Sequence, residues 1–138
     1  MYVGVSVAPA GDVNGDGYAD VAVGAPNYNF LTGRVYVYLG GASGLATTSA
    51  SYLTGEFVDD RFGYSVAAAG DVNGDGYADV IAGAPFYDHP TDNEGGAWVY
   101  LGSSSGLHSA PNWHADGGQT DAELGFSVAS AGDVNRDG

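Results

Sequence analysis

The sequence repeats itself. Residues 11–21 recur without a single change as residues 70–80, and the same run starts a third time at residue 132, where the chain ends after seven residues. The aspartates that open the three runs are 59 and 62 residues apart: Asp12, Asp71 and Asp133. Because chance does not reproduce eleven residues unchanged, the chain is built from units of about sixty residues.

Other motifs keep the same period, so a whole unit is repeated. Gly24-Ala25-Pro26 corresponds to Gly83-Ala84-Pro85, and residues 35–40 correspond to 97–102. Within a unit, short apolar blocks are bounded by Gly, Pro and Asn, which is typical of strands and leaves no room for a ten-residue helix. In the second unit we expect four strands near residues 63–69, 79–84, 96–101 and 112–116.

These features predict an all-β fold made of β-propeller blades with four antiparallel strands each. Small residues crowd the first two strands and aromatic residues occupy the third, as expected where inner strands converge on a narrow axis. We expect one blade over residues 1–60, a second over 61–122, and a partial third over 123–138.

The repeated run has the oxygen spacing of a calcium loop. Ca²⁺ takes six to eight oxygen ligands, and a tightly turning chain supplies them from alternate residues. Side chains at positions one, three, five and nine and the backbone carbonyl at position seven are the predicted ligands: Asp12, Asn14, Asp16, Tyr18 and Asp20 in the first loop, and Asp71, Asn73, Asp75, Tyr77 and Asp79 in the second.

Other interpretations of this loop are weaker. Asp, Asn and Gly also form ordinary turns, but three carboxylates within nine residues repel one another without a cation. Mg²⁺ prefers to keep several waters, whereas this loop offers many protein oxygens. An EF-hand is excluded, because position twelve is Val23 or Ala82 inside a strand instead of a glutamate.

Composition narrows the class of partner. Three Lys and Arg residues against 17 Asp and Glu give a net charge of −14, and such a surface repels nucleic acid and anionic lipid. Eight of those 17 acids belong to the three loops. No apolar run approaches the roughly 20 residues of a membrane span, and the start of the chain lacks the features of a signal peptide. The absence of cysteine excludes disulfide scaffolds and Cys-type zinc sites.

The combined pattern resembles the FG-GAP repeats of the integrin α-chain β-propeller. Phe62-Gly63 and Gly83-Ala84-Pro85 bracket the second loop; Val3-Gly4 and Gly125-Phe126 are read as degenerate forms of the first motif. The resemblance implies a calcium loop between the first and second strands of each blade. It also carries ligand positions onto the truncated third loop, which lacks positions seven and nine: Asp133, Asn135 and Asp137.

The number of units departs from that family, whose propellers typically have seven blades. Two blades cannot close a ring, so the chain is either a fragment or one member of an assembly. Among assemblies we favour a homotrimer of six blades. One of the duplicated first strands, near 2–11 or 123–132, is then redundant or latches the next chain.

Catalytic motifs give weaker signals. Residues 102–106 match a Gly-x-Ser-x-Gly hydrolase elbow, but no helix follows and the first unit has Ala42 where Ser104 stands. The histidines are not spaced for zinc: His89, His108 and His114. We read the aromatic residues of the third strands as core rather than a sugar-binding platform: Tyr36, Tyr38, Trp98 and Tyr100.

Two connections, 27–32 and 86–95, vary between units, and variable loops on a rigid frame are where recognition usually resides. Their aromatic residues are candidate contacts, with simple loop packing as the alternative: Tyr28, Phe30, Phe86, Tyr87 and His89. We expect a non-enzymatic, extracellular or periplasmic module that binds protein or glycan. A fragment of a polysaccharide-degrading enzyme and a purely structural or engineered ring are the alternatives.

Overall fold

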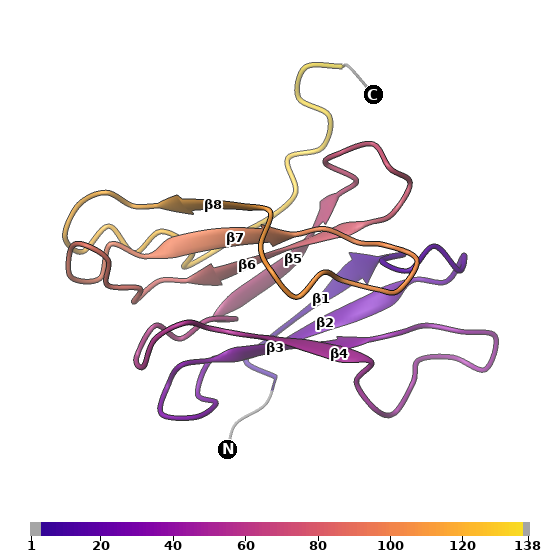
Figure 1. Ribbon diagram of the computed structural model, residues 1–138, viewed down its shortest axis with the longest axis horizontal. Helices are drawn as coiled ribbons and strands as arrows, with labels where there is room; N and C mark the ends of the chain where they lie inside the picture. The colour runs from indigo at the N-terminus through magenta and orange to yellow at the C-terminus, as the bar shows by residue number, and fades with distance from the viewer. Residues whose placement is uncertain (1–3, 137–138) are drawn as a thin grey trace.

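The computed structural model describes residues 4–136, and these residues form two four-stranded antiparallel sheets (Figure 1). The first sheet has the order β1-β2-β3-β4 and the second β5-β6-β7-β8. The strands are β1 (Ser6–Gly11), β2 (Asp20–Ala25), β3 (Arg34–Tyr38), β4 (Ser51–Thr54), β5 (Ser65–Gly70), β6 (Asp79–Ala84), β7 (Gly96–Tyr100) and β8 (Trp113–Asp116).

The all-β prediction with four-stranded antiparallel blades is confirmed. Each strand pairs with the next one in sequence, so each sheet is a simple meander. The described part of the chain contains no helix, and therefore none that could cross a membrane. Both sheets fall inside the predicted units 1–60 and 61–122, and the division into blades 1–60, 61–122 and 123–138 stays our proposal.

Strand alternation gives each sheet two distinct faces. In the first sheet, Ala22 pairs with Val37 and Val35 pairs with Leu53, and all four are buried against the second sheet. The opposite face carries the cross-strand series Val7, Val23, Tyr36 and Tyr52, of which Val7 is 63% and Tyr52 56% exposed. One face of the first sheet is thus core and the other is an open apolar surface.

The second sheet turns its other set of residues toward the first sheet. Val66, Ala82 and Trp98 form one cross-strand series, and Val80 pairs with Tyr100 on the same face. These residues belong to the core cluster or pack against it. The reverse face carries the series Ala67, Ile81, Val99 and Trp113.

The aromatic residues of the third strands are therefore divided between two surfaces. Phe62 is buried and contacts Trp98 and Tyr100 edge-on, with ring centroids 5.9 and 6.0 Å apart. Trp98 and Tyr100 lie between the sheets, as the core interpretation requires, whereas Tyr36 and Tyr38 lie half-buried on the open face of the first sheet. The two units expose different faces because each has only one neighbour.

Contacts between the units use the glycines of the repeat motifs. Ser6 Oγ donates to the carbonyl oxygen of Gly63 at 3.0 Å, and Ser65 Oγ donates to that of Gly125 at 2.7 Å. Gly33 forms an isolated parallel β-bridge with Phe62, and Gly95 forms the equivalent β-bridge with Leu124. Leu124-Gly125 therefore occupies the place of Phe62-Gly63, one residue earlier than the Gly125-Phe126 alignment expected from sequence.

The start of the third unit follows the second sheet. Phe126 packs on Tyr64 with ring centroids 4.9 Å apart, and Ser130 Oγ donates to Ala69 O at 3.5 Å. Beyond Phe126 the described residues form no strand, and all except Val128 are exposed. This segment lies beside β5 much as β5 lies beside β1.

Candidate metal centre

The acidic loops connect the first two strands of each sheet and turn sharply at glycine. In the first loop Gly15 and Gly17 have φ of +72° and +88°, and Gly74 and Gly76 of the second loop have +72° and +90°. Residues with a Cβ rarely adopt these angles. The glycines thus allow the chain to curl around its own acidic side chains.

The first aspartate of each loop accepts backbone N–H groups from inside the loop. Asp12 Oδ1 accepts from Gly15 N at 2.7 Å and Asp16 N at 3.0 Å, and Asp12 Oδ2 accepts from Gly17 N at 2.7 Å. Asp71 accepts in the same way from Asp75 N and Gly76 N at 3.0 and 2.8 Å. These bonds fix the turn without any other group.

The side chains at positions three and five are bonded to each other, and all of them are exposed except the half-buried Asn14. Asn14 Nδ2 donates to Asp16 Oδ2 at 3.0 Å, and Tyr18 N donates to Asp16 Oδ1 at 2.9 Å. Asn73 and Asp75 repeat the first contact at 2.8 Å. The N–H of Tyr77 and the amide of Asn73 lower the pKa of the Asp75 carboxyl. The Asp75 carboxylate is therefore held in its ionised form, and both position-five side chains face solvent.

The aspartates at position nine are the most buried acids of the loops. Asp20 and Asp79 are 1% and 0% exposed. Asp20 accepts from Val13 N at 2.8 Å and Gly40 N at 2.8 Å, which ties the loop to the end of β3. Asp79 accepts from Val72 N and Gly102 N at 2.7 and 2.8 Å. Burial raises the pKa of both carboxyls, and the backbone hydrogen bonds oppose that rise.

The donor set of each loop fits Ca²⁺ in its chemistry. It offers only oxygen, from carboxylates, one amide and one backbone carbonyl, which is the set that hard cations prefer. Each carboxylate oxygen can accept two hydrogen bonds, so Asp12 Oδ2 and both oxygens of Asp16 and Asp20 retain accepting capacity. The charges of Asp16 and Asp12 both raise the pKa of Asp20, so the loop carboxylates repel one another.

The side chains themselves do not form a closed cluster. Among residues 4–136, no three His, Cys, Asp or Glu side chains gather closely enough to hold a metal ion. The amide of Asn14 occupies one oxygen of Asp16. A cation would therefore bind in place of that contact and draw on Asn and backbone oxygens as well as on carboxylates. In the third loop Asp133 and Asn135 are described, whereas Asp137 lies outside the described residues.

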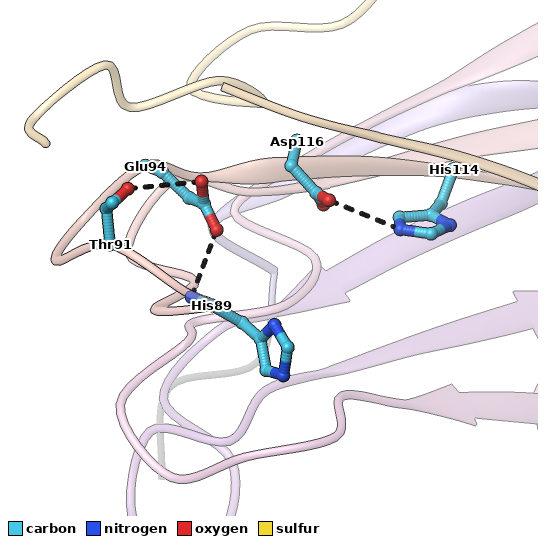
Figure 2. Close-up of polar contacts among 5 residues, drawn as sticks. All are labelled: His89, Thr91, Glu94, His114 and Asp116. Carbon is cyan, nitrogen blue, oxygen red and sulfur yellow. Dashed lines mark hydrogen bonds and ion pairs between the residues drawn. The ribbon is translucent and has the colours of Figure 1, made fainter. Parts of the chain in front are cut away.

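Figure 2 shows two of the three histidines that the sequence left unassigned, His89 and His114. Glu94 is fully buried, and its carboxylate accepts from His89 N and Thr91 Oγ1, both at 3.1 Å. The imidazole of His89 points away from Glu94 (Figure 2) and stacks on Phe57 and Tyr87. His114 pairs with Asp116 at 3.4 Å. Glu94 thus holds the 86–95 loop together through the His89 backbone N–H and the Thr91 hydroxyl.

The candidate recognition residues divide into packed and exposed ones. Tyr87 is buried against Trp98, Phe86 packs on Arg61 and Tyr64, and Tyr28 packs on Arg34. Phe30, in contrast, is 81% exposed at the tip of its loop. Asn29, Phe30 and Leu31 all have positive φ, between 44° and 65°. Residues with a side chain rarely adopt these angles, and strained backbone of this kind clusters at binding sites.

Sequence reasoning missed two buried acids, Glu94 and Asp60. Asp60 is 3% exposed, accepts from Phe57 N at 2.9 Å, and has its pKa raised by burial to about 6. Neither belongs to a residue pattern that repeats between the units. The difference in loop length at residues 86–95 was the only signal that pointed near Glu94.

Comparison with known proteins identifies the repeat. The family model described as FG-GAP repeat matches residues 3–38 and 62–100. Integrin alpha-8 of Mus musculus is 39% identical over 146 residues, which cover 99% of this chain and 13% of the relative. Integrin alpha-6 of Homo sapiens is 43% identical over 129 residues, 91% of this chain and 11% of the relative.

Integrin alpha-PS2 of Drosophila melanogaster is 34% identical over 144 residues, 99% of this chain and 10% of the relative. The chain spans only 10 to 13% of the length of these three relatives. The match confirms the resemblance drawn from the loop and Gly-Ala-Pro motifs. The chain belongs to the FG-GAP repeat family.

Proposed function

We propose that the two complete acidic loops each bind one Ca²⁺ ion. The ligands are Asp12, Asn14, Asp16, the Tyr18 carbonyl and Asp20, and the same positions in the second loop. The observation that carries the proposal is a set of mutually repelling carboxylates, exposed at position five and buried at position nine, on a turn that hydrogen bonds from its own N–H groups preform. Bound calcium neutralises this repulsion and binds the folded loop more tightly than the unfolded chain.

The module acts outside the cell in adhesion or recognition and is not an enzyme. Its integrin alpha relatives support this role. Millimolar extracellular calcium fills loops of weak affinity that would often be empty in the cytosol. The ligand is a protein or a glycan, and the exposed Phe30 on its constrained turn is the contact residue best supported by the structure.

Thermal unfolding in millimolar Ca²⁺ and in excess chelator tests the metal proposal. Calcium is expected to raise the melting temperature, and titration calorimetry is expected to give two sites per chain. The double variant Asp16→Ala with Asp75→Ala should melt at the chelated temperature under both conditions. Glu56→Ala with Asp92→Ala removes the same charge from exposed positions outside the loops and should retain the calcium effect. Coincident melting curves for the unmodified chain would show that the loops are only turns.

The recognition proposal needs its own measurement. The calcium-loaded chain is applied to arrays of glycans and of extracellular matrix proteins, and Phe30→Ala is expected to abolish the binding that is found. Leu45→Ala is the control, because Leu45 is also an exposed apolar residue but lies in the connection between β3 and β4. Binding that survives Phe30→Ala would remove that residue from the contact surface, and the absence of binding to any array would contradict the recognition role.

A further inference from the structure

The two open faces of the molecule are repeat equivalents of the two faces that already meet inside it. The covered face of the first sheet carries Ala22, Val35 and Val37, and the equivalent residues Ile81, Ala97 and Val99 lie on the open face of the second sheet. The covered face of the second sheet carries Trp98 and Tyr100, whose equivalents Tyr36 and Tyr38 lie on the open face of the first sheet.

Burial differs between equivalent residues where a neighbouring sheet is missing. Val13 is completely buried, because the strand end at Gly102 and Ser103 of the second sheet covers it. Its equivalent Val72 is 57% exposed. Tyr100 is 5% exposed, whereas its equivalent Tyr38 is half-buried. On the second sheet the open face is only partly open, because Ala97 and Val99 are 5% and 8% exposed. The missing cover is largest at Val72 and, on the first sheet, at Val7, which is 63% exposed.

Backbone hydrogen bonds across the joint, the contact between the two sheets, differ between the units in the same way. Ala78 N donates to Asp12 O at 2.9 Å, and Ser103 N donates to Val13 O at 3.0 Å, so the acidic loop of the first unit binds the second sheet through its backbone. The equivalent donors Ala19 N and Gly41 N have no hydrogen-bond partner within residues 4–136. The equivalent acceptors, the carbonyls of Asp71 and Val72, have none there either.

We propose that copies of this chain associate head to tail, with the open face of the first sheet of one copy packed on the open face of the second sheet of the next. Ala19 N and Gly41 N of one copy then donate to the Asp71 and Val72 carbonyls of its neighbour. The contact joins two different surfaces and repeats the joint inside the chain. Copies added in this way close into a ring if the rotation per copy is that of a propeller, and we propose that it is.

In this arrangement the β1 strand of the next copy displaces the segment after Phe126. Residues 127–132 lie where the β1 strand of the incoming copy must go, and they are exposed apart from Val128. β1 is paired along its length with β2, so the incoming strand brings its own partner and the tail does not. Since propellers have about four to eight blades, two, three or four copies close a ring, and three copies with six blades are expected.

Sedimentation equilibrium of the full chain in calcium tests the association. A single discrete mass of two to four times 13.9 kDa supports a ring, and three times is the expected value. Val72→Glu and Val7→Glu change exposed residues on the two open faces and should weaken association by at least about tenfold, the effect of roughly 1.4 kcal/mol. Val58→Glu is the matched control outside both faces. A chain that stays monomeric at about 100 μM, and so associates with a Kd above that value, would overturn the proposal, as would open-ended growth.

Cysteine pairing locates the joint independently of mass. The chain has no native cysteine, so Gly41→Cys with Val72→Cys places one thiol on each open face. Gly41 has room for the new side chain, since the nearest atom to its Cβ is 3.8 Å away. Oxidation should link successive copies covalently and give one closed species that resists denaturant. The pair Gly41→Cys with Val58→Cys should stay unlinked. Equal linking of both pairs would show random collision instead of the proposed joint.

Discussion

Gly24 and Gly63 lie so close that a Cβ atom on Gly24 would stand 2.0 Å from the carbonyl oxygen of Gly63. The second unit repeats this relationship between Gly83 and the carbonyl of Gly125, also at 2.0 Å. The glycine of the Gly-Ala-Pro motif in one unit thus packs directly against the backbone of the glycine that opens the next unit. This contact explains why both motifs recur together with the acidic loop.

Gly24→Ala should therefore separate the two sheets locally, because the obstructing atom is backbone and cannot rotate away. We expect the free energy of unfolding to fall by about 3 kcal/mol, the upper range for forced overpacking. Urea unfolding followed by tryptophan fluorescence measures the loss. Gly41→Ala is the control, with its Cβ in ordinary contact at 3.8 Å, and should change stability by less than about 0.5 kcal/mol. Equal stability of the two variants would show that the glycine contact relaxes without cost.

Asp79→Asn should destabilise the protein with or without calcium. An asparagine has one side-chain oxygen, so it cannot accept from both Val72 N and Gly102 N. One buried N–H is left facing an amide donor, at a cost of about 2 kcal/mol. Denaturant unfolding in chelator measures this cost without any contribution from metal.

Asp75→Asn should weaken calcium binding and leave the stability of the calcium-free protein nearly unchanged, in contrast to Asp79→Asn. Asp75 is exposed, and asparagine can still accept from Tyr77 N. We expect little change of stability in chelator and a clear loss of calcium affinity at the second loop by calorimetry. If Asp75→Asn and Asp79→Asn lose the same stability in chelator, the assignment of one to the metal and the other to the scaffold is wrong.

Asp60→Asn tests the cost of a buried acid. Burial raises the Asp60 pKa from its usual 3.8 to about 6, so the folded protein holds this proton more tightly than the unfolded chain. The cost of ionisation grows as pH rises from 3.8 to about 6 and is complete above that. The variant should exceed the unmodified protein in stability by at most about 3 kcal/mol at pH 7 and by nothing near pH 4. A pH-independent difference would contradict this origin.

Much of the fold was predictable because the repeat displays the same strand pattern twice. Strands β6 to β8 lie within one residue of the expected ranges, and β5 begins two residues later. The acidic loop was equally legible, since each of its oxygen-bearing residues lies close in sequence to the others. What could not be predicted is which aromatic residues meet. Phe62 packs on Trp98 and Tyr100, and contacts between units leave no spacing rule in the sequence.

The position-nine aspartates show a second limit. Sequence reasoning treated Asp20 and Asp79 as ligands, and the structure also gives each a scaffolding role through Gly40 and Gly102. A carboxylate can bond backbone N–H groups and a cation at once, so residue type alone does not reveal the additional role. Buried acids outside the repeat pattern, such as Glu94, are fixed by loop conformation and stayed invisible for that reason.

The hydrogen bonds from Ser6 to Gly63 and from Ser65 to Gly125 have an evolutionary consequence. Each unit is completed by contacts with the opening residues of the following one, so no unit forms all of its contacts by itself. A gene can lengthen such an array only by inserting whole periods, because any other insertion would break the phase between serine and glycine. The point at which recombination cuts within the period is immaterial, since every cut that preserves the phase regenerates the same joint. Arrays of this kind are therefore free to change their number of units while keeping one interface unchanged.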